Sequence, residues 1–251
     1  MRIVKRQKVC YDRENKDVRQ NMIFHGFQKM TMLDYPGHVA CTLFTAGCNF
    51  RCPFCHNATL VTSITKDDLH TEEEILTYLR KRRGILDGVC ITGGEPLMQT
   101  DLKAFIIKVK ELGLMVKLDT NGSNPSLLKE LIEEGLLDYV AMDIKNAPNK
   151  YALTAGLDQV DMEAIRQSVD ILKGCNIPYE FRTTIVPEYH TASDIEEIAK
   201  WLSGCYGYFL QQFVDSGCTI RNNLHAYAPS AMMELLQITK KYVPNAQLRG
   251  V

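Results

Sequence analysis

Residues 88–96 read Gly-Val-Cys-Ile-Thr-Gly-Gly-Glu-Pro, and they indicate how the whole chain is built. A short apolar, β-branched run bounded by glycine and proline predicts a buried strand, here over 88–92. The strand ends in two glycines and an acid, residue types that suit close backbone approach and hydrogen bonding rather than packing. This stretch therefore predicts a core strand whose carboxyl end carries chemistry.

Helical patterns lie on both sides of this strand. Before the strand, Thr71 and Glu74 form a capping box that predicts the start of an amphipathic helix, and Gly84 predicts its end. After it, we expect Thr100 to cap a helix that ends at Gly113. Alternation of helix and strand is typical of βα units around a parallel sheet.

The same alternation extends over most of the chain. Further strands are predicted near 38–45, 114–119, 138–143, 179–186 and 207–213. Further helices are predicted from Asn124-Pro125 to Gly135, near 161–173, from Ser193 with Glu196, and over 230–241. Six strands are two short of a closed eight-fold barrel, so we predict an α/β fold, an incomplete (β/α)6 TIM-like barrel. We expect one domain over 22–251 and a basic, flexible N-terminal extension over 1–21.

Polar residues follow four of the predicted strands directly. They are Cys48 after the first strand, Gly93-Gly94-Glu95 after the second, Asp119-Thr120-Asn121-Gly122 after the third, and Asp143-Ile144-Lys145 after the fourth. The carboxyl ends of parallel barrel strands meet at one rim, where active sites are built. We therefore expect these segments to share one cavity.

The most specific signal is the CxxxCxxC loop over 48–57, Cys-Asn-Phe-Arg-Cys-Pro-Phe-Cys-His-Asn. Three thiolates on one short loop can hold a [4Fe-4S] cluster and leave one iron open for a substrate. The alternative is a zinc site, which ordinarily needs a fourth ligand; His56 would have to turn back directly after Cys55 to supply it. The spacing favours the iron-sulfur cluster.

This loop, with the aromatic Phe54 before the third cysteine, resembles the radical S-adenosylmethionine (SAM) superfamily, and Gly93-Gly94-Glu95 resembles that family's glycine-rich strand end. The resemblance implies an oxygen-sensitive oxidoreductase in which Cys48, Cys52 and Cys55 hold the cluster. In that family, SAM chelates the open iron through its amino and carboxylate groups, and an electron from the cluster cleaves SAM to a 5′-deoxyadenosyl radical.

A narrower resemblance points to the activating enzymes of glycyl-radical enzymes. It is carried by Asp34-Tyr35-Pro36-Gly37, Cys55-His56-Asn57 and the two motifs that start at Asp119 and Asp143, and it covers about 22–215. From His25 to Asn57 the chain is most similar to activating proteins of anaerobic ribonucleoside-triphosphate reductase. Pyruvate formate-lyase activating enzymes are near relatives. The implied partners are a large glycyl-radical enzyme, with this reductase favoured, and a flavodoxin or ferredoxin as electron donor.

The resemblance also implies roles for individual residues. SAM contacts are implied at Phe54, His56, Gly93, Gly94, Glu95, Asp119, Asn121, Asp143, Lys145 and Arg182, the last as a carboxylate clamp. A monovalent-cation site is implied at Asp119, Thr120 and Asp143. The chain departs from some relatives at Gln211-Gln212-Phe213, where they have a histidine. Without the cysteine loop, Asp143 and Lys145 would be interpreted as an ordinary salt bridge.

The composition and charge of the chain argue against a membrane protein and a secreted protein. The 251 residues are 45% hydrophobic and 24% charged with a formal net charge of −1, and no apolar run approaches the roughly 18 residues of a membrane span. The basic residues of the first twenty are not followed by an apolar signal region, so we expect a cytoplasmic protein with no membrane or nucleic-acid partner. The six cysteines outside the loop are assigned no chemistry.

Two rival functions remain open. One is a radical SAM enzyme that acts on a small molecule or RNA. The other is an iron-sulfur electron carrier, which normally needs a fourth cysteine that this loop lacks. For a peptide substrate, we expect binding near Asp34 and beside the sixth strand.

Overall fold

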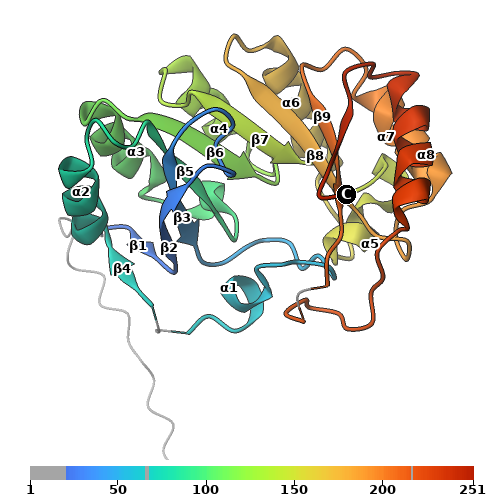
Figure 1. The fold of residues 1–251 in the computed structure, drawn as a ribbon, viewed down its shortest axis with the longest axis horizontal. Coiled ribbons are helices and arrows are strands. Elements are labelled where there is room, and N and C mark those ends of the chain that lie inside the picture. Colours follow the sequence, from blue (N-terminus) through green and yellow to red (C-terminus); the bar gives the residue numbers. More distant parts are fainter. Residues whose placement is uncertain (1–20, 66–67, 216) are drawn as a thin grey trace, which may run out of the picture.

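Six parallel strands form the centre of the fold in the computed structural model, which describes residues 21–65, 68–215 and 217–251. All six lie where the sequence predicts them: β3 (Ala40–Thr45), β5 (Gly88–Gly93), β6 (Met115–Thr120), β7 (Tyr139–Asp143), β8 (Tyr179–Ile185) and β9 (Tyr208–Gln212). They pair in that order, every neighbouring pair parallel. The strands curve around a central space (Figure 1), which confirms the incomplete barrel.

Two edge strands extend the sheet to eight and were not predicted. β2 (Phe27–Thr31) pairs antiparallel with β3, and β10 (Gln247–Arg249) pairs parallel with β9. β2 and β10 end the sheet on opposite sides, so within the described chain the barrel stays open between them. A separate short pair, β1 (Ile23–Phe24) and β4 (His70–Thr71), lies beside the sheet.

Six helices cover the outside of the sheet (Figure 1). They are α2 (Glu72–Lys81), α3 (Leu102–Glu111), α4 (Pro125–Glu133), α6 (Met162–Gly174), α7 (Ala192–Trp201) and α8 (Pro229–Lys240). Alternate strand residues, such as Val116 and Leu118, are fully buried in the core beneath these helices. The residues between them, such as Lys117 and Asp119, therefore face the inside of the barrel.

Shorter elements follow several strands at the rim. They are α1 (Ala58–Thr62), α5 (Tyr151–Ala155) and two 3₁₀ turns, η1 (Pro96–Met98) and η2 (Pro148–Lys150). None of them was predicted, because a single turn of helix leaves too little periodicity to detect. Figure 1 shows α1 across the open end of the barrel, away from the outer helices.

The predicted helix starts are partly confirmed. The Thr71–Glu74 capping box is present, and Asn124 caps α4 by accepting a hydrogen bond from the backbone of Leu127. Thr100 is wrong as a cap, since the preceding η1 turn shifts the start of α3 to Asp101. Ser193 with Glu196 is also wrong. There, the earlier Thr191 forms the capping box with Asp194.

Tyr35 closes the end of the barrel opposite the strands' carboxyl ends. Its ring is only 2% exposed and lies 6.0 Å from the ring of Tyr139 and 4.8 Å from that of His38. Nearby, Asp34 accepts a hydrogen bond from Thr42 at 2.6 Å. Asp34 is therefore engaged with a strand residue that comes well before the rim.

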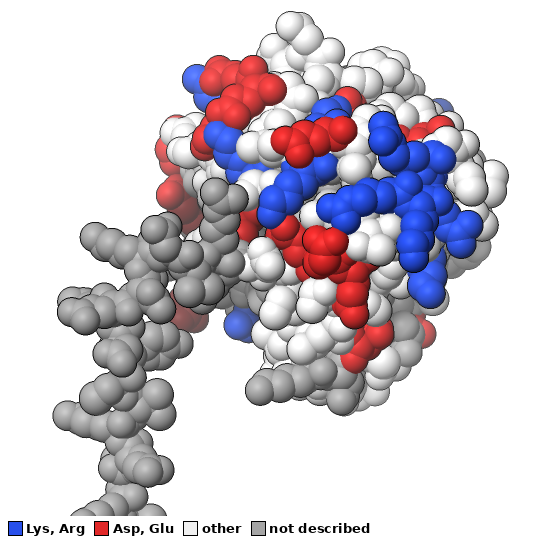
Figure 2. All heavy atoms as spheres, turned by 90° about the vertical axis from the view of Figure 1, so that its left-hand side faces the viewer, with Lys and Arg blue, Asp and Glu red and all other residues white. Residues whose placement is uncertain are grey.

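The predicted extension over 1–21 lies outside the described residues, apart from Asn21. No described helix is long and apolar enough to cross a membrane. Figure 2 shows the side of the molecule that carries α2. Lys and Arg side chains gather there in one patch with Asp and Glu beside it, so the visible surface carries both signs of charge.

Candidate active site

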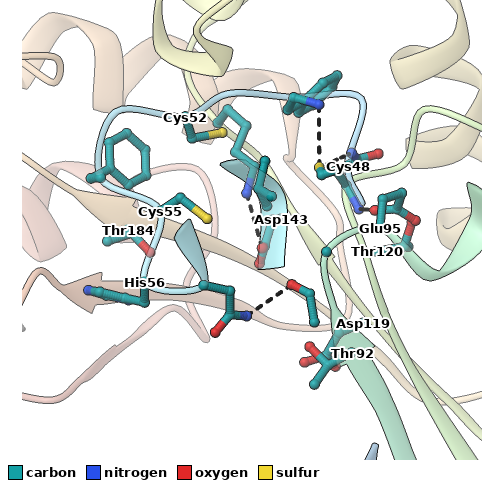
Figure 3. Close-up of a pocket in the computed structure, with 18 of the residues that line it drawn as sticks. Cys48, Cys52, Cys55, His56, Thr92, Glu95, Asp119, Thr120, Asp143 and Thr184 are labelled. Carbon is teal, nitrogen blue, oxygen red and sulfur yellow. Dashed lines mark hydrogen bonds and ion pairs between the residues drawn. The ribbon is translucent and has the colours of Figure 1, made fainter. Parts of the chain in front are cut away.

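Cys48, Cys52 and Cys55 lie on the loop between β3 and α1 and line a cavity of about 230 Å³. Figure 3 shows Cys52 and Cys55 on one side of this pocket and Cys48 on the other, with the three sulfur atoms directed into the space between them. Burial raises the pKa of all three thiols, that of Cys52 to about 12. The thiols are therefore protonated until a metal displaces the protons.

The donor set fits an iron-sulfur cluster. Three thiols from one loop face one cavity, as three-cysteine ligation of a four-iron cluster requires. His56 does not join them: its Nε2 lies 3.0 Å from the backbone oxygen of Val214, and its ring stacks on Phe213 with 5.6 Å between ring centres. Within the described ranges, no group of three His, Cys, Asp or Glu side chains is arranged to hold a single metal ion, which needs its ligands closer together than a four-iron cluster does.

Hydrogen bonds from distant segments fix the cysteine loop. The Arg51 N–H donates to the Ala155 oxygen at 2.8 Å, and the Arg221 N–H donates to the Pro53 oxygen at 2.9 Å. Phe54 is 5% exposed, packs against the rings of Tyr189 and His190 and lines the cavity. The loop is therefore held in place by packing before any cofactor binds.

The glycines after β5 are required by close backbone contact. A Cβ atom on Gly94 would lie 1.9 Å from the Gly47 oxygen, and one on Gly93 would lie 2.4 Å from the backbone of Thr45. The backbone N–H of Glu95 donates to Gly47 at 2.8 Å. The glycine-rich strand end is thus packed directly against the residue that precedes Cys48.

Glu95 is almost fully buried, and its carboxylate links two strand ends. It accepts hydrogen bonds from the Thr120 hydroxyl at 2.7 Å, the Asn121 N–H at 2.7 Å and the Leu97 N–H at 3.1 Å. Burial raises the pKa of Glu95 to about 7, although these hydrogen bonds oppose the shift. Its first role is to hold the turn after β6 against the end of β5.

Arg182 lies at the centre of a charged group on three neighbouring strands. Its guanidinium donates to Asp143 at 2.9 Å and to Asp119 at 3.1 Å, and Lys145 donates to Asp143 at 3.1 Å. Burial alone would raise the pKa of Asp143, but the charges of Arg182 and Lys145 outweigh it and lower the pKa to about 2. Asp143 also raises the pKa of Lys145, against the effect of burial. These groups are therefore charged at neutral pH.

The oxygens expected to bind a monovalent cation already have partners. Arg182 bridges Asp119 and Asp143, Lys117 donates to Asp119, and the Thr120 hydroxyl donates to Glu95. A cation at this place would compete with the Arg182 guanidinium for both carboxylates. The cation site stays a prediction.

The structure adds residues that the sequence analysis did not single out. Lys117 is 2% exposed and contacts Asp119 and Cys90 from inside the barrel. Side chains two residues apart on a strand point to the same face, so the sequence could have placed Lys117 beside Asp119. Asn57 donates to the Gly93 oxygen at 2.9 Å. Phe50, Val61, Thr92, Thr184 and Gln211 also line the cavity. Val61 and Thr184 belong to no motif, whereas Phe50, Thr92 and Gln211 lie in stretches that the sequence analysis noted for other reasons.

The cysteines outside the loop are free thiols where they are described. Cys41, Cys90 and Cys205 are buried, Cys175 is half-buried, and Cys218 is exposed. Cys10 lies outside the described residues.

Comparison with known proteins gives consistent matches. Residues 42–202 match the model of the Radical SAM superfamily. Over 237 residues the chain is 33% identical to a protein of Methanocaldococcus jannaschii provisionally named a glycyl-radical enzyme activating enzyme; the match covers 90% of this chain and 95% of the relative. A pyruvate formate-lyase-activating enzyme of Staphylococcus aureus is 29% identical over 181 residues, which cover 68% of this chain and 70% of that enzyme.

Solved structures share the fold at low sequence identity. Streptococcus suis SuiB aligns with a TM-score of 0.65 and 15% identity over 83% of this chain, which spans about half (48%) of the SuiB chain. Archaeal TYW1 aligns with a TM-score of 0.54 and 16% identity, covering 81% of this chain and 72% of that one.

Proposed function

Since the chain belongs to the radical SAM superfamily and to its glycyl-radical enzyme activating enzymes, we propose that its rim pocket cleaves SAM reductively and places a glycyl radical on a partner enzyme. A [4Fe-4S] cluster held by Cys48, Cys52 and Cys55 would supply, once reduced by an external donor, the electron that breaks the bond between the SAM sulfur and its 5′ carbon. The protein's own residues bind and orient the two cofactors.

One observation carries this proposal: three thiols and a set of half-buried charged side chains line the same cavity. The thiols provide three cluster ligands and leave one iron open. Arg182 and Lys145 are cations that suit the SAM carboxylate, and Asp119 and Asp143 are anions that suit its ammonium. Binding then requires Arg182 to exchange part of its contact with the aspartates for the ligand.

We assign the adenine side of the cofactor to His56. Its ring is stacked on Phe213 and its side chain lines the cavity, so an aromatic surface is held at the pocket wall. Gly93 and Gly94 also line the cavity, and their missing side chains let the end of β5 pack directly on Thr45 and Gly47.

The partner we favour is an anaerobic ribonucleoside-triphosphate reductase. This choice rests on the similarity of residues 25–57 to activating proteins of that enzyme. A peptide substrate is supported by the sheet, which is open between β2 and β10. Asp34 is a weaker candidate for peptide binding, because it is hydrogen-bonded to Thr42 inside the barrel.

We further propose that the electron comes from a separate flavodoxin or ferredoxin. Residues 57–70 contain no cysteine that could ligate a second cluster. Asn49 and Arg51 are exposed, so part of the cysteine loop is open to a small donor protein. A cytoplasmic location belongs to this proposal, because the free thiols that ligate the cluster persist in a reducing compartment.

The deciding experiment mixes the reconstituted protein, reductant and SAM with each candidate partner under anaerobic conditions. Electron paramagnetic resonance (EPR) is expected to detect a glycyl radical doublet on the reductase. A strong doublet on pyruvate formate-lyase or another partner, with none on the reductase, would overturn the choice of partner. SAM cleavage without a radical on any protein partner would favour a small-molecule or RNA substrate.

A further inference from the structure

Two N–H groups are directed at the sulfur of Cys48. The backbone N–H of Phe50 lies 3.3 Å from Sγ, and the side-chain amide of Asn121 lies 3.8 Å from it. The Phe50 contact comes from the cysteine loop itself. The Asn121 contact comes from the turn after β6, which is 73 residues further along the chain.

The Asn121 amide is held with its NH₂ group toward Cys48. Its Oδ1 accepts the backbone N–H of Ser123 at 2.9 Å, and its Nδ2 donates to Asn49 at 2.8 Å. The oxygen is therefore committed to Ser123, which orients the nitrogen toward the cysteine loop. Asn121 is 5% exposed, so water competes little for this amide.

The turn that carries Asn121 is itself fixed by buried hydrogen bonds. Glu95 accepts the Asn121 backbone N–H at 2.7 Å, and Ser168 donates to the Gly122 oxygen at 2.6 Å. A Cβ on Gly122 would lie 2.0 Å from the side chain of Met142, so the turn also packs tightly on β7. The amide dipole is thus preorganised.

The three cysteine sulfurs differ in whether a side chain from another segment donates a hydrogen bond to them. Among the described residues, no side chain donates a hydrogen bond to the sulfur of Cys52 or Cys55, and the backbone N–H of Asn57 faces the Cys55 sulfur as that of Phe50 faces Cys48. Asn49 does not supply a second side-chain donor to Cys48, because its Nδ2 donates to Ser123 at 2.8 Å. The contact from the turn after β6 is therefore specific to one amide and one sulfur.

We propose that Asn121 is a positioning residue that raises the reduction potential of the cluster by donating an N–H···S hydrogen bond to Cys48. The inference rests on the proposed function, since it requires the cluster. Reduction adds negative charge to the cluster and its sulfurs, and a hydrogen-bond donor stabilises the more negative state. The amide thereby makes it easier for an external donor to deliver the electron that SAM cleavage needs.

The test measures midpoint potentials by EPR-monitored redox titration of anaerobically reconstituted protein. Asn121→Leu removes the donor at similar size, and Asn121→Asp replaces it with an anionic oxygen. Ser126→Ala is the control, since Ser126 is exposed on α4, directly after the same turn, and its side chain makes no hydrogen bond to the described residues. We expect a lower potential in Asn121→Leu, a still lower one in Asn121→Asp, and no change in Ser126→Ala.

Unchanged potentials in both Asn121 variants, at full iron content, would overturn the proposal. A second measurement applies to the wild type, in case a variant loses its cluster. With asparagine side chains labelled with ¹⁵N, pulsed EPR of the reduced cluster should detect a weak coupling to an amide nitrogen, and its absence would overturn the proposal. A protein that binds no iron at all would instead refute the proposed function.

Discussion

Arg182 and Asp143 are register partners on the neighbouring strands β8 and β7, and the Arg182 Nε donates to Asp143 Oδ1 at 2.9 Å. The same guanidinium reaches Asp119 on β6 at 3.1 Å. One side chain therefore joins three adjacent strands at the rim where the cysteine loop lies. The same ion pairs therefore hold the strand ends together and set the positions of the charges in the pocket.

Asp143→Asn should destabilise the apoprotein, because it leaves the charges of Arg182 and Lys145 only partly compensated in a half-buried place. The Asp143 side chain is 33% exposed, so we expect a loss of about 1–3 kcal/mol, less than a fully buried pair would cost. Urea unfolding of the reduced apoprotein measures the loss. Glu133→Gln is the control, since its pair with Lys129 is exposed and such pairs contribute less than about 1 kcal/mol. Equal stability changes in the two variants would contradict the role given to Asp143.

Glu95 should make the free energy of unfolding decrease as the pH rises. Its folded pKa of about 7 lies above the ordinary 4.5, so between these values the folded state holds more of the proton than the unfolded state does. Stability conferred by the protonated carboxyl is complete below pH 4.5 and is lost as pH rises towards 7. One pKa unit corresponds to about 1.4 kcal/mol, so this group contributes a change of about 3 kcal/mol.

The measurement compares wild type and Glu95→Gln by urea unfolding at pH 5, 6, 7 and 8. The wild type should lose stability relative to the variant as pH increases over this range. A difference between the two proteins that stays constant with pH would show that Glu95 titrates normally.

Gly94→Ala should displace the cysteine loop, because the new Cβ would lie 1.9 Å from the Gly47 oxygen and backbone cannot give way cheaply. We expect lower iron uptake on reconstitution and a loss of stability of a few kcal/mol, as overpacking typically costs about 1–3 kcal/mol. Gly174→Ala is the control, since nothing lies within 4 Å of its added Cβ. Normal iron uptake by Gly94→Ala would mean that the loop is not held by this contact.

The sequence predicted the six central strands because each is a short apolar run with a polar end. It did not predict β2 and β10. Their burial patterns alternate weakly or not at all, and they become strands only by pairing with β3 and β9. The helix start at Ser193 failed because the nearby Thr191 forms the capping box, and the start at Thr100 failed because α3 begins after Asp101, whose side chain makes no cap hydrogen bond.

The cysteine loop and the strand-end motifs were predicted to share a cavity, and they line the same one. What the sequence could not indicate is how these residues bond to each other. Glu95 was expected to face the ligand, yet its oxygens accept three protein donors. The contact between Asn121 and Cys48 depends on the packing of two loops, which no local pattern encodes.

The central claim is that Cys48, Cys52 and Cys55 hold a cluster that cleaves SAM. Its most direct test is the amount of 5′-deoxyadenosine formed when anaerobically reconstituted protein receives dithionite and SAM. The wild type, loaded with about four irons as three-thiolate ligation implies, should release 5′-deoxyadenosine, and Cys52→Ala should release none. Stoichiometric zinc without iron uptake, or equal product from Cys52→Ala, would contradict the account.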